Sequence, residues 1–176
     1  PLVGIEPAVK PAAQNHRGEK VAVMATPLTL HEEKFKQLVK RYEDQAVIIP
    51  VPCPDLGEYV EKGILEGPEL EGYLKDVLTP CLQEGIKAVV LGCTHFPLVK
   101  SAIGKVVGES VRIYDGGEGT ARQAKCLLAA KNLCTDQEKG HICFESSAPE
   151  KEAYYEALYR KAARIDSRVK LWVLGH

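Results

Sequence analysis

The most informative part of the sequence is Val89-Val90-Leu91-Gly92-Cys93-Thr94-His95-Phe96-Pro97-Leu98. It opens with a short apolar run of the length of a buried strand, and this run ends in a glycine. A cysteine, a threonine and a histidine follow in consecutive positions, and a proline then stands where a helix can begin. Open α/β sheets bind ligands at the carboxyl ends of their strands. The thiol and the imidazole are therefore expected where such a sheet places its ligand site.

Two interpretations of Cys93 follow from its residue type. In the first, Cys93 is a reactive thiol, because a strand end beside a helix N-terminus favours the thiolate. His95 would then hold a proton for the thiolate, and Thr94 would donate its hydroxyl and backbone N–H groups to a carboxylate. In the second interpretation, Cys93 is a small buried hydrophobic residue next to a surface turn.

The overall composition is that of an ordinary globular chain of 176 residues, with 45% hydrophobic and 27% charged residues. The net charge is −1, so no basic excess predicts binding to nucleic acid. No apolar stretch has the length of a membrane span, and no signal peptide is evident, which predicts a cytoplasmic location. The six cysteines show no C-x-x-C pair and no zinc-like spacing to histidine, which predicts reduced thiols and no metal site. Disulfides in a secreted protein are the alternative.

Strands alternate with helices along the chain, which predicts βαβ units and a mainly parallel sheet in an α/β fold. Strands are expected at residues 2–5, 21–25, 47–49, 88–91, 111–114, 141–144 and 169–174. Helices are expected at about 30–42, 59–63, 70–85, 103–107, 120–133 and 149–163. Pro50 and Pro52 are expected to close the second of the buried strands. The turn Asp115-Gly116-Gly117 is the best candidate for a domain boundary.

Three further residues are candidates for the site. Thr26 and Thr29 follow the strand at 21–25 and would converge with Cys93 at the carboxyl edge of the sheet, although helix capping by Thr29 explains them equally well. Glu61 lies on the short helix after Cys53-Pro54 and would bring a carboxylate, although a solvated helix face is the plainer explanation. Four other cysteines are expected to be structural, namely Cys81, Cys126, Cys134 and Cys143. His141 is expected at a strand edge, whereas His16, His31 and His176 are expected to be exposed and without a role.

The motif at 92–98 resembles the second cysteine motif of the cofactor-independent aspartate/glutamate racemase family, in the form that its glutamate racemases carry. Ala25-Thr26-Pro27-Leu28-Thr29 is similar to the threonine-x-glycine-threonine substrate loop of that family. Cys53-Pro54 with Val60-Glu61-Lys62-Gly63 is similar to its Cys-Pro…Val-Glu-x-Gly segment. Asp115-Gly116 with Thr120-Ala121 resembles the region where the chain re-enters the first domain. The similarity extends in the right order over essentially all 176 residues.

The resemblance implies an enzyme that interconverts L- and D-glutamate with two cysteines and without a cofactor or a metal. One thiolate removes the α-proton from one face of the substrate, and a second thiol returns a proton to the other face. The product D-glutamate would supply peptidoglycan synthesis. Cys93 is the base expected to act on L-glutamate. Carried over by motif, the catalytic residues are Cys93, His95 and Glu61, and the substrate-binding residues are Thr94, Thr26 and Thr29.

The sequence departs from the family pattern in two places. Leu28 stands where the family usually has glycine, and the Asp-Ser and Cys-Asn-Thr motifs of the first half are absent. The sequence therefore predicts a racemase without its N-terminal portion: residues 1–114 form a complete α/β domain, and residues 115–176 are the returning segment of an incomplete second one. Such a chain is expected to be inactive alone and to expose apolar surface, which a homodimer or a missing piece of chain would cover. The alternatives are a racemase of aspartate or a related amino acid, and a non-catalytic binding domain.

Overall fold

The computed structural model describes residues 2–135, 145 and 147–165. These residues fall into two compact units. One unit comprises Glu6–Asp115, and the other comprises the described residues from Gly116 onward together with the N-terminal residues up to Ile5. The division between Asp115 and Gly116 lies within the turn expected at a domain boundary. The N-terminal residues up to Ile5 group with the second unit, whereas the sequence places them with the first.

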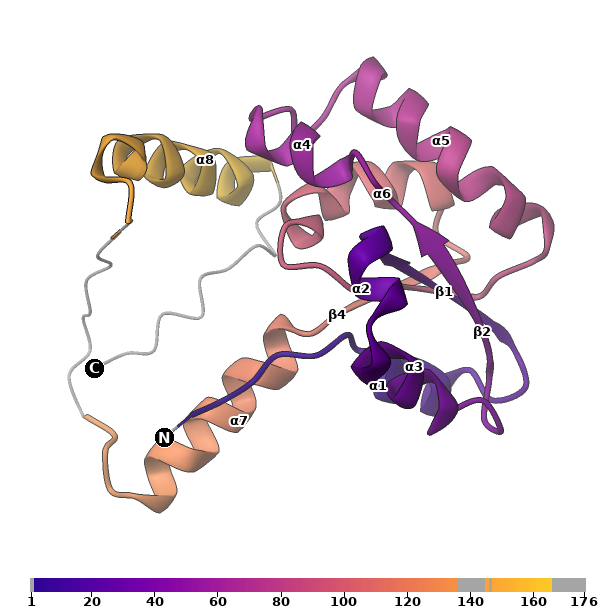
Figure 1. Ribbon diagram of the computed structural model, residues 1–176, viewed down its shortest axis with the longest axis horizontal. Helices are drawn as coiled ribbons and strands as arrows, with labels where there is room; N and C mark the ends of the chain where they lie inside the picture. The colour runs from indigo at the N-terminus through magenta and orange to yellow at the C-terminus, as the bar shows by residue number, and fades with distance from the viewer. Residues whose placement is uncertain (1, 136–144, 146, 166–176) are drawn as a thin grey trace. The chain divides into compact units, whose positions relative to one another are not determined.

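The first unit is built on a sheet of four parallel strands in the order β2-β1-β3-β4 (Figure 1). The strands are β1 (Lys20–Ala25), β2 (Val47–Pro52), β3 (Ala88–Leu91) and β4 (Arg112–Asp115). In the register of the sheet, Val21 lies opposite Ile48 on one side and Ala88 on the other. The predicted α/β class with a parallel sheet is confirmed, and the predicted strand at 88–91 coincides with β3.

Strand β2 differs from the prediction because it continues through both of its prolines. Pro50 pairs with Val23 of β1, and Pro52 pairs with Ala25. Proline cannot donate a hydrogen bond to a ladder, so within sheets it is confined to edge strands, strand starts and bulges. Because β2 is the outer strand on its side of the sheet, it tolerates prolines that a central strand would exclude.

Helices α1 (Val9–Asn15) and α3 (Glu33–Lys40) cover one face of this sheet (Figure 1). Their apolar residues form a core with alternate residues of the two central strands, because successive strand side chains point to opposite faces. This core consists of Ala8, Val9, Ala12, Ala13, Val21, Val23, Phe35, Leu38, Ala46, Ala88 and Val90. Leu30, Val39, Tyr42, Ile48 and Tyr114 pack against it.

The opposite face is covered by α5 (Pro68–Gln83) and α6 (Lys100–Val107) (Figure 1). Leu70, Leu74 and Leu78 of α5 are fully buried at the spacing of one helix face, as predicted. Helix α4 (Leu56–Glu61) and the 3₁₀ helix η1 (Phe96–Val99) complete the first unit, with α2 (Pro27–His31) between β1 and α3.

The prediction of a strand at the start of the chain is wrong. Residues 2–5 form no strand, and Leu2 and Ile5 are exposed. Helix α1, which is not among the predicted helices, contains Pro11 in its first turn, where the missing N–H has no intrahelical acceptor in any case. Its buried residues Val9, Ala12 and Ala13 follow the helical spacing.

The second unit contains α7 (Gly117–Ala130), the 3₁₀ helix η2 (Pro149–Lys151) and α8 (Glu152–Ile165). The two predicted helices are confirmed with shifted bounds. None of the residues of α7 is buried. The strands expected at 141–144 and 169–174 lie outside the described residues, as do His141, Cys143 and His176. Among the helices that the structure describes, none is long and apolar enough to cross a membrane.

Candidate functional site

The carboxyl ends of three strands are joined by backbone hydrogen bonds. The Gly92 N–H group, just after β3, donates to the Met24 carbonyl of β1 at 2.7 Å. The Cys53 N–H group, just after β2, donates to the Ala25 carbonyl at 2.9 Å. This edge is where a parallel sheet presents its ligand site, and it carries Cys93 directly after Gly92.

Gly92 is required by its close approach to β1. A Cβ atom at this position would lie 2.8 Å from the Met24 carbonyl oxygen and 3.2 Å from the Ala25 Cβ atom. Contacts below 3.0 Å with a backbone atom force the chain apart, so a side chain here would push the following turn away from the sheet. Gly92 therefore fixes where the turn that carries Cys93 begins.

The turn at residues 93–95 leads into η1, whose second residue is Pro97. Phe96 is fully buried and anchors this turn, while Cys93 and His95 are half-buried and Thr94 is exposed. The alternative of a fully buried Cys93 is therefore wrong, because the residue is open to solvent at the strand end.

Cys93, His95 and Glu61 form a chain of contacts at this edge. The Cys93 Sγ atom lies 3.8 Å from His95 Nδ1, and His95 Nε2 lies 2.9 Å from Glu61 Oε1. A carboxylate only accepts, so Nε2–H donates to Glu61, which leaves Nδ1 of the neutral ring to accept the thiol proton. The side chains of His95 and Glu61 are 38% and 47% exposed, so water weakens this contact. Glu61 thus makes a specific contact and is more than a solvated residue of α4.

Cys53 lies at the same edge but is unsuited to acid/base chemistry. Burial raises its pKa from the ordinary value of 9.0 to about 12, and its thiol donates to the Val51 carbonyl at 3.4 Å. Burial also raises the pKa of Cys81. Cys126 and Cys134 are exposed rather than packed, so the prediction of a structural role is wrong for these two.

The two threonines form a helix cap, which is one of the two interpretations that the sequence leaves open. Thr26 is the N-cap of α2, since its Oγ1 accepts from the Thr29 N–H group at 3.3 Å, and the two hydroxyl oxygens are 3.0 Å apart. The expectation that Thr29 caps the next helix is wrong, because Glu32 occupies that position. Leu28, which lies between Thr26 and Thr29, is 74% exposed.

No metal-binding group of three His, Cys, Asp or Glu residues occurs in the described part of the chain.

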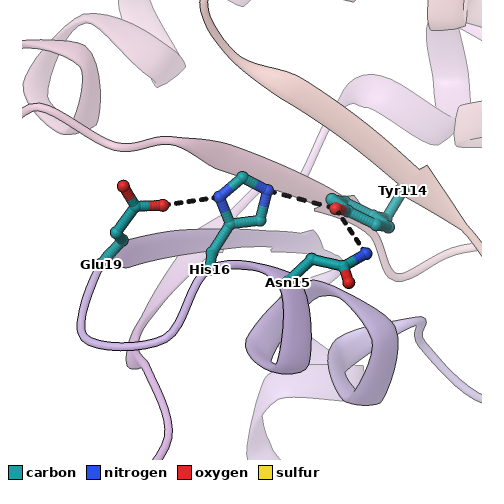
Figure 2. Close-up of polar contacts among 4 residues, drawn as sticks. All are labelled: Asn15, His16, Glu19 and Tyr114. Carbon is teal, nitrogen blue, oxygen red and sulfur yellow. Dashed lines mark hydrogen bonds and ion pairs between the residues drawn. The ribbon is translucent and has the colours of Figure 1, made fainter.

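A second histidine, His16, also lies against a carboxylate (Figure 2). His16 Nδ1 lies 2.7 Å from Glu19 Oε2, and His16 Nε2 lies 3.1 Å from the Tyr114 hydroxyl, to which Asn15 Nδ2 donates at 3.1 Å. The side chain of His16 is 15% exposed, so the prediction of an exposed residue is wrong. The spacing of His16 and Glu19 by three residues is the only sign in the sequence that the two side chains meet.

A sequence model of the family described as Asp/Glu/Hydantoin racemase matches residues 1–124. The chain belongs to this family. The matched part of this racemase-family chain includes all four strands, the Cys93–His95–Glu61 contacts and the Thr26–Thr29 cap.

The chain is similar to glutamate racemases from Clostridium species. It is 43% identical to the one from Clostridium perfringens strain ATCC 13124 over 153 residues, which are 86% of this chain and 59% of that protein. It is 48% identical to the one from Clostridium kluyveri strain ATCC 8527 over 139 residues, which are 79% of this chain and 54% of that protein. The chain thus spans a little over half the length of these relatives.

A solved structure of Escherichia coli glutamate racemase, in complex with L-glutamate and the activator UDP-MurNAc-Ala, has the same fold. It matches with a TM-score of 0.74 and 30% identity, over 92% of this chain and 62% of that one. The predicted resemblance to glutamate racemases is therefore confirmed, both in sequence and in fold.

Proposed function

We propose that this chain carries one of the two acid/base groups of a glutamate racemase, and that Cys93 is this group. The single observation that carries the proposal is the contact chain from Cys93 through His95 to Glu61, with separations of 3.8 and 2.9 Å. It combines a solvent-accessible thiol with a base and with a carboxylate that orients this base. The similarity to named glutamate racemases supports glutamate as the substrate.

The proposed reaction needs the thiolate of Cys93. The proton of the thiol moves to His95 Nδ1, and the imidazolium that forms is stabilised by the Glu61 carboxylate. The thiolate then takes the α-proton of L-glutamate, and the electron pair of the broken C–H bond stays on the substrate as a carbanion. A second thiol protonates the carbanion on the opposite face, which gives D-glutamate. No oxidant or reductant is consumed, and neither cofactor nor metal is invoked.

Three residues are proposed to hold the substrate. Thr94 is exposed in the turn between Cys93 and His95, where its hydroxyl and N–H groups can donate to a carboxylate. Thr26 and Thr29 are half-buried and follow β1, which is hydrogen-bonded to Gly92. Their hydroxyls already bond to each other, so substrate binding would use their remaining donor and acceptor capacity.

The second base is proposed to lie outside this chain. Cys53 remains protonated up to a pH of about 12, and the sequence contains no Cys-Asn-Thr motif. We therefore propose that Glu6–Asp115 is the complete domain, in place of residues 1–114, and that the residues from Gly116 onward return to a second domain whose main part this chain does not contain. The 176 residues alone are expected to racemise neither isomer. In its complete form, the enzyme would supply D-glutamate for peptidoglycan in the cytoplasm.

Self-association belongs to the same proposal. Leu2, Ile5, Leu133 and Tyr154 of the second unit are exposed, by 93%, 54%, 57% and 40%. Such surface favours association with a second copy of this chain. Analytical ultracentrifugation is expected to show a homodimer at micromolar concentration. A strictly monomeric chain would remove this part of the proposal.

The test of the proposed function is exchange of the α-proton in deuterated water. The protein is used in a form extended by the Cys-Asn-Thr-bearing portion, with L-glutamate, D-glutamate, L-aspartate and D-aspartate supplied separately. Exchange of both glutamate isomers, with little exchange of aspartate, is expected. Exchange confined to aspartate would show a different substrate, and no exchange together with no glutamate binding would support a non-catalytic domain.

A further inference from the structure

Tyr73 of α5 contacts the start of the helix that carries Glu61. Its hydroxyl oxygen accepts a hydrogen bond from the Asp55 N–H group at 3.4 Å. Asp55 is the N-cap residue of α4, and its own side chain makes no capping hydrogen bond. The first N–H groups of a helix have no intrahelical acceptor, so the Tyr73 hydroxyl satisfies one donor at this helix end.

The ring of Tyr73 holds the same helix at a second point. Its centroid lies 5.3 Å from that of Tyr59 on α4, with the two planes tilted by 42°. Aromatic pairs at such distances attract each other beyond the burial of their area. Tyr73 is half-buried, and burial raises its pKa to about 12, so the phenol stays neutral at physiological pH.

Helix α4 is short and depends on such external contacts for its placement. It has six residues, which is too few for a stable helix in isolation. Its last residue is Glu61, whose carboxylate bonds to His95. Leu56 and Val60 are fully buried and attach the helix to the core of the domain. Tyr73 contacts the start of the helix through its hydroxyl and its ring.

We propose that Tyr73 is a positioning residue for the acid/base site, because it holds α4 in the position from which Glu61 orients His95 toward Cys93. This inference rests on the proposed function of the contact chain. In the described part of the chain, the hydrogen bond and the ring contact of Tyr73 go to Asp55 and Tyr59 and not to Cys93 or His95. Loss of Tyr73 should therefore act on Cys93 only through Glu61.

The test measures alkylation of Cys93 by iodoacetamide in the 176-residue chain, at pH 7 and at pH 10, by peptide mass spectrometry. The exposed thiol of Cys126 serves as an internal reference. Glu61→Gln is expected to slow Cys93 at pH 7 by about two- to fivefold, because a half-exposed ion pair contributes little more. At pH 10 the difference should vanish, because hydroxide then replaces the neighbouring base in removing the proton of a thiol.

The variants of Tyr73 are then compared with Glu61→Gln. Tyr73→Leu should give the same loss at pH 7, and Tyr73→Phe, which keeps the ring, should retain part of the rate. The double variant Tyr73→Leu/Glu61→Gln should be no slower than either single variant, because both changes interrupt the same interaction. Tyr42→Leu, which alters a half-buried tyrosine that packs on the core with α1 and α3, should leave the Cys93 rate unchanged.

Three results would overturn the inference. If Glu61→Gln slows Cys93 and neither Tyr73 variant does, the role of Tyr73 fails while the proposed function stands. If Tyr73→Leu raises the Cys93 alkylation rate at both pH values, the substitution only exposes Cys93 by loosening the fold, and Tyr73 has a purely structural role. If Glu61→Gln itself has no effect at pH 7, the contact chain does not activate Cys93, and both the inference and the proposed mechanism fail.

Discussion

The Nε2 atom of His95 lies 2.9 Å from the Oε1 atom of Glu61, although the two residues are 34 positions apart in the sequence. This contact joins the end of α4 to the turn after β3. It gives the imidazole a direction, with Nδ1 facing the thiol of Cys93 at 3.8 Å. The His16 ring has the opposite orientation, because its Nδ1 atom faces Glu19 and its Nε2 atom faces the Tyr114 hydroxyl (Figure 2).

The two histidines are therefore expected to be opposite tautomers when neutral. His95 should carry its proton on Nε2, and His16 should carry it on Nδ1, since each carboxylate can only accept a hydrogen bond. The ¹⁵N chemical shifts of the two rings, measured by NMR at a pH where both are neutral, report this directly. A proton on Nε2 of His16, or on Nδ1 of His95, would contradict the geometry described above.

Gly92→Ala is expected to destabilise the first unit by about 1–3 kcal/mol, because its Cβ atom would lie 2.8 Å from the Met24 carbonyl oxygen. Urea unfolding measures the change. The matched control is Gly72→Ala in α5, where a Cβ atom meets nothing within 4 Å and should stabilise the helix by about 0.5–1 kcal/mol. Equal effects of the two substitutions would show that the contact with β1 is unimportant.

Tyr114→Phe is expected to cost about 1–2 kcal/mol, because it removes the hydroxyl that bonds to both Asn15 and His16 and leaves their polar atoms without this partner (Figure 2). Tyr42→Phe serves as the control in the same denaturation experiment, since Tyr42 packs against the same core. A variant at Tyr114 that is as stable as the original chain would show that this cluster does not help to attach α1 to β4.

The stability of the chain is expected to fall as the pH rises above about 9. Burial raises the pKa of Cys53 from 9.0 to about 12, so the folded chain keeps a proton that the unfolded chain loses in this range. The free energy of unfolding then decreases with pH, by at most about 1.4 kcal/mol per pH unit for one such group. Burial raises the pKa of Tyr73 to about 12 as well, and that of Cys81 in the same direction.

Cys53→Ala should therefore flatten the decline between pH 9 and 10, where the unfolded form of Cys53 titrates before that of Tyr73. Urea unfolding at several pH values measures the slope in both proteins. An unchanged slope in the variant would show that Cys53 is not buried as described.

The sequence predicts the strand end and its motif well because both depend on neighbouring residues. The apolar run at 88–91, Gly92 and Pro97 determine β3 and η1 locally. The pairing of His95 with Glu61 depends on how α4 packs, which no local pattern contains. The sequence could only place Glu61 near the site through its resemblance to a known segment.

The predictions that the structure contradicts failed for physical reasons. Prolines such as Pro50 and Pro52 usually end a strand. Strand β2 tolerates them because it is an edge strand, and its edge position depends on the whole sheet. Thr29 has the side chain of a helix cap, yet Thr26 takes that role because α2 begins immediately after β1. His16 is polar and follows a short helix, and its burial arises from Tyr114, which lies 98 residues away in the sequence.

Cys93 is the proposed base for L-glutamate, and isomer-specific proton exchange measures this role. In deuterated water, Cys93→Ala in the extended form should abolish exchange of the L-glutamate α-proton. Cys126→Ala, which removes an exposed thiol elsewhere, should leave exchange intact. Undiminished exchange of L-glutamate by Cys93→Ala would show that another group is the base.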